Sequence, residues 1–177
     1  MLRRTVFSGF GGQGLMFIGK LFAGMALEKA EHVTFIPSYG AEVRGGTSNC
    51  QITLASSEIA SPIVEEADAM ILMNQPSVDR FLPLLSENGT AFVNTSMAEL
   101  PSDDRIVGIP ATDLAHEAGN VLAANIVMFG AYLRREGLFS FEEVAARIAE
   151  VSAGKGAEFG AVNAAAFEKG WNFEQAG

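Results

Sequence analysis

Two spacings of hydrophobic residues alternate along the chain and predict strands and helices in turn. Continuous apolar runs at residues 69–73 and 90–93 are typical of parallel strands that are buried on both faces. In residues 15–29 the apolar positions recur every three or four residues, which predicts a helix with one face on a sheet. With short strands predicted at 5–8 and 32–36, the chain opens as strand, glycine turn, helix and strand.

The rest of the chain continues this alternation. A strand is predicted at residues 105–109, and helices are predicted at residues 77–85, 111–118, 120–135, 140–152 and near 161–170. Ser140 and Glu143 have the spacing of a capping box at the start of one helix. The pattern predicts a single domain over residues 1–177, with an α/β fold: a doubly wound, mostly parallel sheet with helices on both faces.

One segment departs from this pattern. Residues 47–54 alternate strictly, with Cys50, Ile52 and Leu54 on one side and polar residues between them. The chain then turns at 55–57 into residues 58–60. This indicates a half-buried antiparallel hairpin, made by these two segments and inserted after the second strand.

Charge and composition exclude some partners and favour others. The 12 Lys and Arg residues against 21 Asp and Glu residues give a formal charge of −9, which disfavours nucleic acid because binding to phosphates needs a cationic surface. Only 19% of the residues are charged and 49% are hydrophobic. Such a chain either enters a membrane or buries part of its outside against other proteins.

The membrane alternative fails on length. The best apolar stretches, residues 15–27 and 121–133, are interrupted by Lys20 and Asn125, and neither reaches the ~18–20 residues of a spanning helix. The glycines at 9–14 stand where a signal peptide needs an apolar region. We therefore expect a cytoplasmic protein with protein partners and no membrane partner.

Metal and redox chemistry have few candidate ligands in this sequence. The single cysteine, Cys50, excludes an internal disulfide and cannot hold an iron–sulfur cluster, which takes about four thiolates. Its position in the alternating segment predicts a small buried hydrophobic residue. His32 and His116 have no second ligand at metal spacing, so no metal site is expected.

The glycine turn is the first candidate site. Residues 9–14 read GFGGQG, follow a predicted strand and open a predicted helix. Such a turn either binds an anion through free N–H groups and the helix dipole, or only permits tight packing of the strand and the helix. Independent NAD or FAD binding is disfavoured, because residues 36–38 offer no acid for the ribose at the end of the second strand.

The loop after the second predicted strand is the second candidate site. It combines glycines with Tyr39, Glu42 and Arg44 where an open α/β sheet binds ligands. Arg44 can grip a phosphate or carboxylate bidentately, or pair with an acid. We expect the glycine turn and residues 39–47 to border one crevice, with Arg44 and the N–H groups of residues 12–14 as anion donors.

Four segments, in this order, resemble the gamma subunits of 2-oxoacid:ferredoxin oxidoreductases, above all those of 2-oxoglutarate enzymes: GFGGQG at 9–14, PSYGAEVRGGTSNC at 37–50, SPIV at 61–64 and MNQPS at 73–77. The resemblance covers nearly the whole chain. It implies a complex with alpha, beta and often delta subunits, in which the other chains hold thiamine diphosphate, Mg²⁺ and [4Fe–4S] clusters. The complex decarboxylates a 2-oxoacid, transfers the acyl group to coenzyme A and passes electrons to ferredoxin.

Carried over position by position, the resemblance implies ligand or interface residues in both segments: Gly11, Gly12, Gln13, Gly14, Tyr39, Glu42, Arg44, Gly45, Gly46 and Thr47. It does not identify a catalytic residue, and it implies no cofactor bound by this chain alone. The anion that we expect is a coenzyme A phosphate, with a partner carboxylate as the second candidate.

Three functions stay open at this point. The first is a subunit of such an oxidoreductase, for 2-oxoglutarate or for a branched-chain 2-oxoacid, pyruvate or indolepyruvate. The second is a self-sufficient dinucleotide-binding oxidoreductase. The third is a non-catalytic assembly module that uses the same loops only as an interface.

Overall fold

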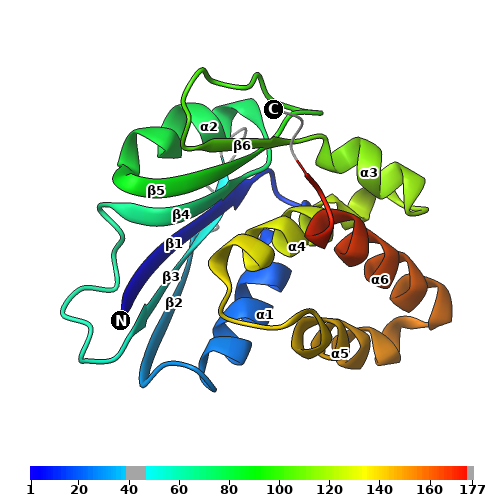
Figure 1. Ribbon diagram of the computed structural model, residues 1–177, viewed down its shortest axis with the longest axis horizontal. Helices are drawn as coiled ribbons and strands as arrows, with labels where there is room; N and C mark the ends of the chain where they lie inside the picture. Colours follow the sequence, from blue (N-terminus) through cyan, green and yellow to red (C-terminus); the bar gives the residue numbers. More distant parts are fainter. Residues whose placement is uncertain (39–46, 175–177) are drawn as a thin grey trace.

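The structure, a computed structural model, describes residues 1–38 and 47–174. The described strands form one mixed sheet in the order β2-β3-β1-β4-β5-β6 (Figure 1). β2, β1, β4, β5 and β6 all run in one direction, and β3 alone runs against them, between β2 and β1. The strands are β1 (Leu2–Gly9), β2 (His32–Ser38), β3 (Ser48–Ala55), β4 (Ala67–Leu72), β5 (Leu85–Asn94) and β6 (Ile106–Ile109).

Helices cover both faces of this sheet, which confirms the predicted doubly wound fold class. α2 lies on one face, where Val78 and Phe81 pack in a smaller core cluster. α1 and α4 lie on the other face over the larger cluster, with α5 and α6 outside them (Figure 1). The helices are α1 (Leu15–Ala26), α2 (Gln75–Phe81), α3 (Ala111–Glu117), α4 (Ala124–Glu136), α5 (Phe141–Ser152) and α6 (Ala157–Trp171), with short 3-10 turns η2 (Leu82–Leu84), η3 (Val121–Ala123) and η4 (Ala153–Lys155).

The antiparallel strand predicted near residues 47–54 exists as β3, but the predicted hairpin of this strand with residues 58–60 is wrong. β3 pairs with β2 before it in the chain and with β1, whereas residues 58–60 form no strand. The expected half-burial is also wrong, because both faces of β3 are covered. Cys50 lies against α1, and on the other face Gln51 accepts a hydrogen bond from Val64 N at 2.7 Å.

Helix ends follow local signals that the sequence carries. The capping box at Ser140 is present: its hydroxyl accepts from Glu143 N at 3.2 Å, and the Glu143 carboxylate accepts from Ser140 N at 2.7 Å. The helix predicted over 120–135 is divided, because Asn120 caps η3 before α4 begins. The last helix begins at Ala157, earlier than predicted, directly after Gly156 at φ 98°.

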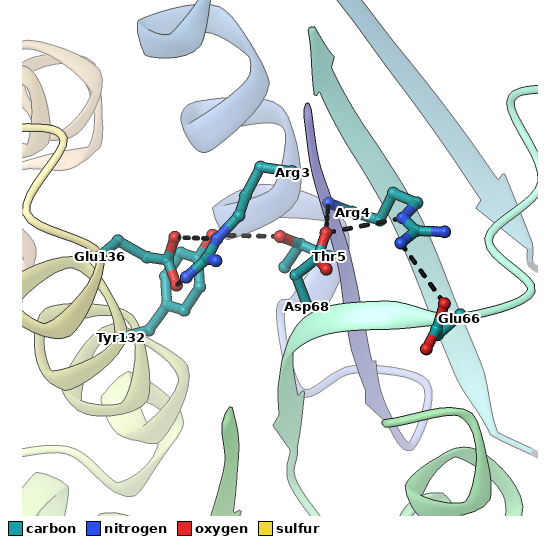
Figure 2. A network of polar contacts seen from close by, with 7 residues as sticks. All are labelled: Arg3, Arg4, Thr5, Glu66, Asp68, Tyr132 and Glu136. Atoms are coloured by element: carbon teal, nitrogen blue, oxygen red, sulfur yellow. Dashed lines mark hydrogen bonds and ion pairs between the residues drawn. The ribbon is translucent and has the colours of Figure 1, made fainter. Parts of the chain in front are cut away.

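A partly buried polar network joins the amino end of β1 to α4 and β4 (Figure 2). Arg3 donates to both carboxylate oxygens of Glu136, at 2.6 and 2.7 Å, and the Glu136 side chain is only 2% exposed. Tyr132 lies within 3.2 Å of the Thr5 hydroxyl, and its burial raises the pKa of the phenol well above its ordinary value. Asp68 accepts from Arg4 N at 2.7 Å. Since this network lies at the opposite strand end from the glycine turn, we assign it to the scaffold.

Within residues 1–38 and 47–174, no helix combines the length and the apolar character needed to cross a membrane.

Candidate functional site

The glycine turn leaves the carboxyl end of β1 and starts α1. Gly12 and Gly14 have φ values of 92° and 74°, in the left-handed region that favours glycine. A Cβ on Gly9 would lie 2.5 Å from Gln13 Oε1, and a Cβ on Gly14 would collide with the Asn125 amide. At Gly11 and Gly12 a Cβ would meet no described atom within 4 Å. The outer glycines therefore permit packing, while the two middle ones present open backbone.

The Gln13 side chain fixes the turn through hydrogen bonds to the backbone of the turn and to neighbouring segments. Its Oε1 accepts from Phe10 N at 2.6 Å and from Asn74 Nδ2 at 3.2 Å, and its Nε2 lies 3.5 Å from Met97 Sδ. Asn74 in turn caps α2, since its Oδ1 accepts from Ser77 N. The turn after β1 is therefore tied to the start of the helix that follows β4.

Asn125 is a site residue that reasoning from the sequence missed. Its Nδ2 donates to Gly14 O at 3.1 Å, although 111 residues separate the two in the chain. The side chain is buried, at 5% exposure, and lies where the first turn of α4 meets the first turn of α1. An amide inside a long apolar run, at 121–133, was the available signal.

A groove of about 180 Å³ runs beside the turn. It is lined by the turn, by Met97 after β5, by Thr112 of α3, and by η3 and the start of α4. The described residues that line it carry no charge. Large apolar side chains at its rim are exposed, with Leu122 72% and Met97 43% accessible. An uncharged groove with exposed apolar walls is typical of a surface that another protein covers.

The second predicted segment is described only at its ends. Tyr39, Glu42, Arg44, Gly45 and Gly46 lie outside the described residues. Thr47 is buried, and its Oγ1 accepts from Arg80 Nη1 at 3.2 Å.

The strands that flank this segment end beside the glycine turn. Ser48 pairs with Gly9 and Asn49 pairs with Ser38. The carboxyl ends of β1 and β2 therefore share one sheet edge, as the fold class requires, and the common crevice stays a prediction. Arg80, an exposed cation of α2 at the same edge, gave no signal in the sequence because it lies far along the chain.

The order of the strands argues against a dinucleotide site. In a dinucleotide-binding fold the acid that binds the ribose ends the strand next to β1. Here β3 lies between β1 and β2, and β2 ends in Ile36, Pro37 and Ser38. The glycine motif thus lacks the partner that this chemistry needs.

Cys50 is buried as predicted, and its surroundings disfavour the reactive thiolate form. It is 0% exposed, its Sγ lies 3.6 Å from Leu15 O, and burial raises the pKa of the thiol to about 12. Within the part of the chain that the structure describes, no three His, Cys, Asp or Glu residues are grouped to hold a metal ion. The residues present do not fit an iron–sulfur cluster, because the chain has one cysteine.

Comparisons with known proteins give matches along nearly the whole chain. Residues 4–173 match the family model described as pyruvate ferredoxin/flavodoxin oxidoreductase. The chain is 31% identical, over 97% of its length and 93% of the relative's, to the 2-oxoglutarate synthase subunit KorC of Methanocaldococcus jannaschii. It is 36% identical to the ketoisovalerate oxidoreductase subunit VorA of Methanothermobacter marburgensis over 72% of this chain, but it spans only 27% of that protein.

A solved structure has the same fold. It is the gamma subunit of a keto/oxoacid ferredoxin oxidoreductase from Geobacter sulfurreducens, with a TM-score of 0.78, 26% identity and 96% coverage of both chains.

Proposed function

The chain belongs to the pyruvate ferredoxin/flavodoxin oxidoreductase family, and from this premise we propose that it is the gamma subunit of a 2-oxoacid:ferredoxin oxidoreductase complex. The observation that carries the proposal is the full-length match to a 2-oxoglutarate synthase subunit. The uncharged, apolar groove beside the glycine turn supports it, because such a surface suits a subunit covered by partners.

In this proposal the other chains carry out the decarboxylation and the electron transfer. Alpha and beta subunits, with a delta subunit in some complexes, hold thiamine diphosphate, Mg²⁺ and [4Fe–4S] clusters, which supply decarboxylation and electron transfer to ferredoxin. The gamma chain contributes binding and orientation. A cytoplasmic location is part of the proposal, and a lone free thiol is typical of a reducing compartment.

The role that we propose for the sheet edge is to bind a coenzyme A phosphate. The open backbone of Gly11 and Gly12 lies at the start of a helix, where N–H groups and the helix dipole favour an anion. Gln13 and Asn125 position that backbone through their hydrogen bonds to the turn. Arg44 would add the charge-assisted contact, with Tyr39, Glu42, Gly45, Gly46 and Thr47 as the rest of the proposed site.

We propose 2-oxoglutarate as the substrate, since the KorC relative matches along nearly its whole length. A branched-chain 2-oxoacid is the second candidate, because the ketoisovalerate relative has the higher identity over the segment that it shares. Relative rates of the assembled complex with the two acids decide between them.

The purified chain alone is expected to be colourless and inactive, because it has one cysteine, buried in the core, and its sequence shows no recognisable acid–base constellation. Co-expression with the thiamine-binding and cluster-binding chains should give reduction of a viologen dye that depends on both a 2-oxoacid and coenzyme A. Dye reduction by the 177-residue chain alone would overturn the proposal.

The groove beside the turn gives a second expected result. Leu122→Glu should weaken assembly with the partner chains by about tenfold or more, because a carboxylate would be buried in an apolar interface. The same change should reduce self-association of the isolated chain, which leaves this surface uncovered. Analytical ultracentrifugation measures both effects.

Leu27→Glu is the matched control for that experiment. Leu27 is 67% exposed, close to the 72% of Leu122, but it follows the other end of α1. Equal assembly of both variants would contradict an interface at the groove.

A further inference from the structure

A second cavity, of about 270 Å³, lies on the helical face of the sheet and shares Leu122 and Asn125 with the groove. Its walls come from the first turns of α1 and α4, from η3 and from α6. These three helices lie together on that face (Figure 1). The proposed function uses Asn125 and Leu122 at the rim of this cavity but places no ligand inside it, so a ligand bound there would be a property beyond that function.

The cavity is mainly apolar and has no acid among the described residues that line it. Phe17 comes from α1, Ile126 from α4, and Phe159 and Val162 from α6. Rings and branched side chains from helices far apart in the chain thus surround a space of small-molecule size. Such walls favour a ligand with an apolar body.

Lys155 supplies the only cation among the described lining residues. Its Nζ lies 4.9 Å from the ring centroid of Phe17 and 5.0 Å from that of Phe159, so two aromatic rings hold the ammonium group at the cavity. Within the described chain Lys155 forms no ion pair, whereas Lys29 and Lys169 pair with Glu143 and Glu117. A bound anion would therefore meet a cation that no acid already neutralises.

Asn163 adds a polar group that is almost fully buried, at 4% exposure. It lines the cavity, and its Nδ2 donates to Ser152 Oγ at 3.3 Å, whereas its Oδ1, an acceptor, has no hydrogen-bond partner among the described residues. A hydroxyl both donates and accepts, so a turned amide keeps the Ser152 contact and offers its NH₂ group to an anion.

We infer that this cavity binds a small organic carboxylate with an apolar body. The carboxylate lies at Lys155 and Asn163, and the body lies against the apolar walls formed by Ile126, Phe159 and Val162. Inorganic phosphate leaves the apolar walls unfilled, and a neutral hydrocarbon leaves Lys155 unused, so neither matches both halves of the cavity.

The test uses the purified full-length chain and two probes of equal shape, 3-phenylpropionate and 3-phenylpropan-1-ol, titrated by calorimetry at pH 7. The acid should bind about tenfold more tightly than the alcohol, because only the acid gains a charge-assisted contact. Lys155→Gln should lower the affinity for the acid by about tenfold and leave the affinity for the alcohol unchanged. Phe159→Ala should lower the affinity for both probes, because it removes an apolar side chain that lines the cavity.

Lys20→Gln is the matched control, since Lys20 is exposed on α1 and does not line the cavity. It should leave the affinity for both probes unchanged. The inference is overturned if the acid shows no saturable binding, if the alcohol binds as tightly as the acid, or if Lys155→Gln leaves the affinity for the acid unchanged. None of these outcomes depends on partner subunits or on oxidoreductase activity.

Discussion

Gly170→Ala should destabilise the chain by about 3 kcal/mol or more and lower Tm by about 6–12 °C, as measured by thermal and chemical unfolding of the purified protein. A Cβ on Gly170 would collide with Val127 O and would lie 2.7 Å from Val127 C. Gly130 faces the same contact, since its Cβ would lie 2.6 Å from Phe167 O. The α4 and α6 backbones touch at these glycines, so an added methyl group must push the helices apart.

Gly160→Ala is the control in the same helix. A Cβ there would lie 3.7 Å from Ser152 Cβ, an ordinary contact, so the change should leave stability equal or raise it by up to about 1 kcal/mol. If Gly170→Ala is as stable as Gly160→Ala, α4 and α6 are not packed backbone to backbone.

Arg44→Ala in the assembled complex should raise KM for coenzyme A by about ten- to a hundredfold. The reason is that the proposed charge-assisted contact, worth about 1.5–3 kcal/mol, would be lost. Arg44→Lys should restore only part of the affinity, because an ammonium group cannot reproduce the planar fork of the guanidinium. Steady-state kinetics with coenzyme A as the varied substrate measure the effect.

Arg147→Ala serves as the control for charge alone. Arg147 is a partly exposed arginine of α5 that pairs with Glu150 at 2.6 Å, away from the sheet edge. Its loss should leave KM for coenzyme A unchanged. Unchanged coenzyme A kinetics in Arg44→Ala would show that Arg44 does not bind coenzyme A. A loss of assembly instead would show that the loop is an interface element.

Local features of this protein could be predicted because neighbouring residues encode them. The helix starting at Leu15, the capping box at Ser140 and the burial of Cys50 each depend on residues a few positions apart. The position of the glycine turn between a strand and a helix is of the same kind. The predicted partner of β3 was wrong because strand pairing joins distant segments, and alternation alone shows that a strand exists without showing which strand it pairs with.

The candidate site was predicted in part for the same reason. The turn at Gly11 to Gly14 is visible as a motif, whereas Asn125 and Arg80 reach the sheet edge only through folding. The residues next to such a side chain in the sequence do not indicate which distant segment it will contact.

By itself the sequence determined the α/β class, the glycine turn, the lack of cluster ligands and, through ordered motifs, the family. These depend on periodicity, composition and short spacings. The tertiary structure decided that β3 separates β1 from β2, that Gly9 and Gly14 serve packing while Gly11 and Gly12 stay open, and that Lys155 meets Phe17 at a cavity. The position of β3, the packing of Gly14 against Asn125 and the contact of Lys155 with Phe17 each join segments far apart in the chain, and such contacts exist only once the helices and strands have packed together.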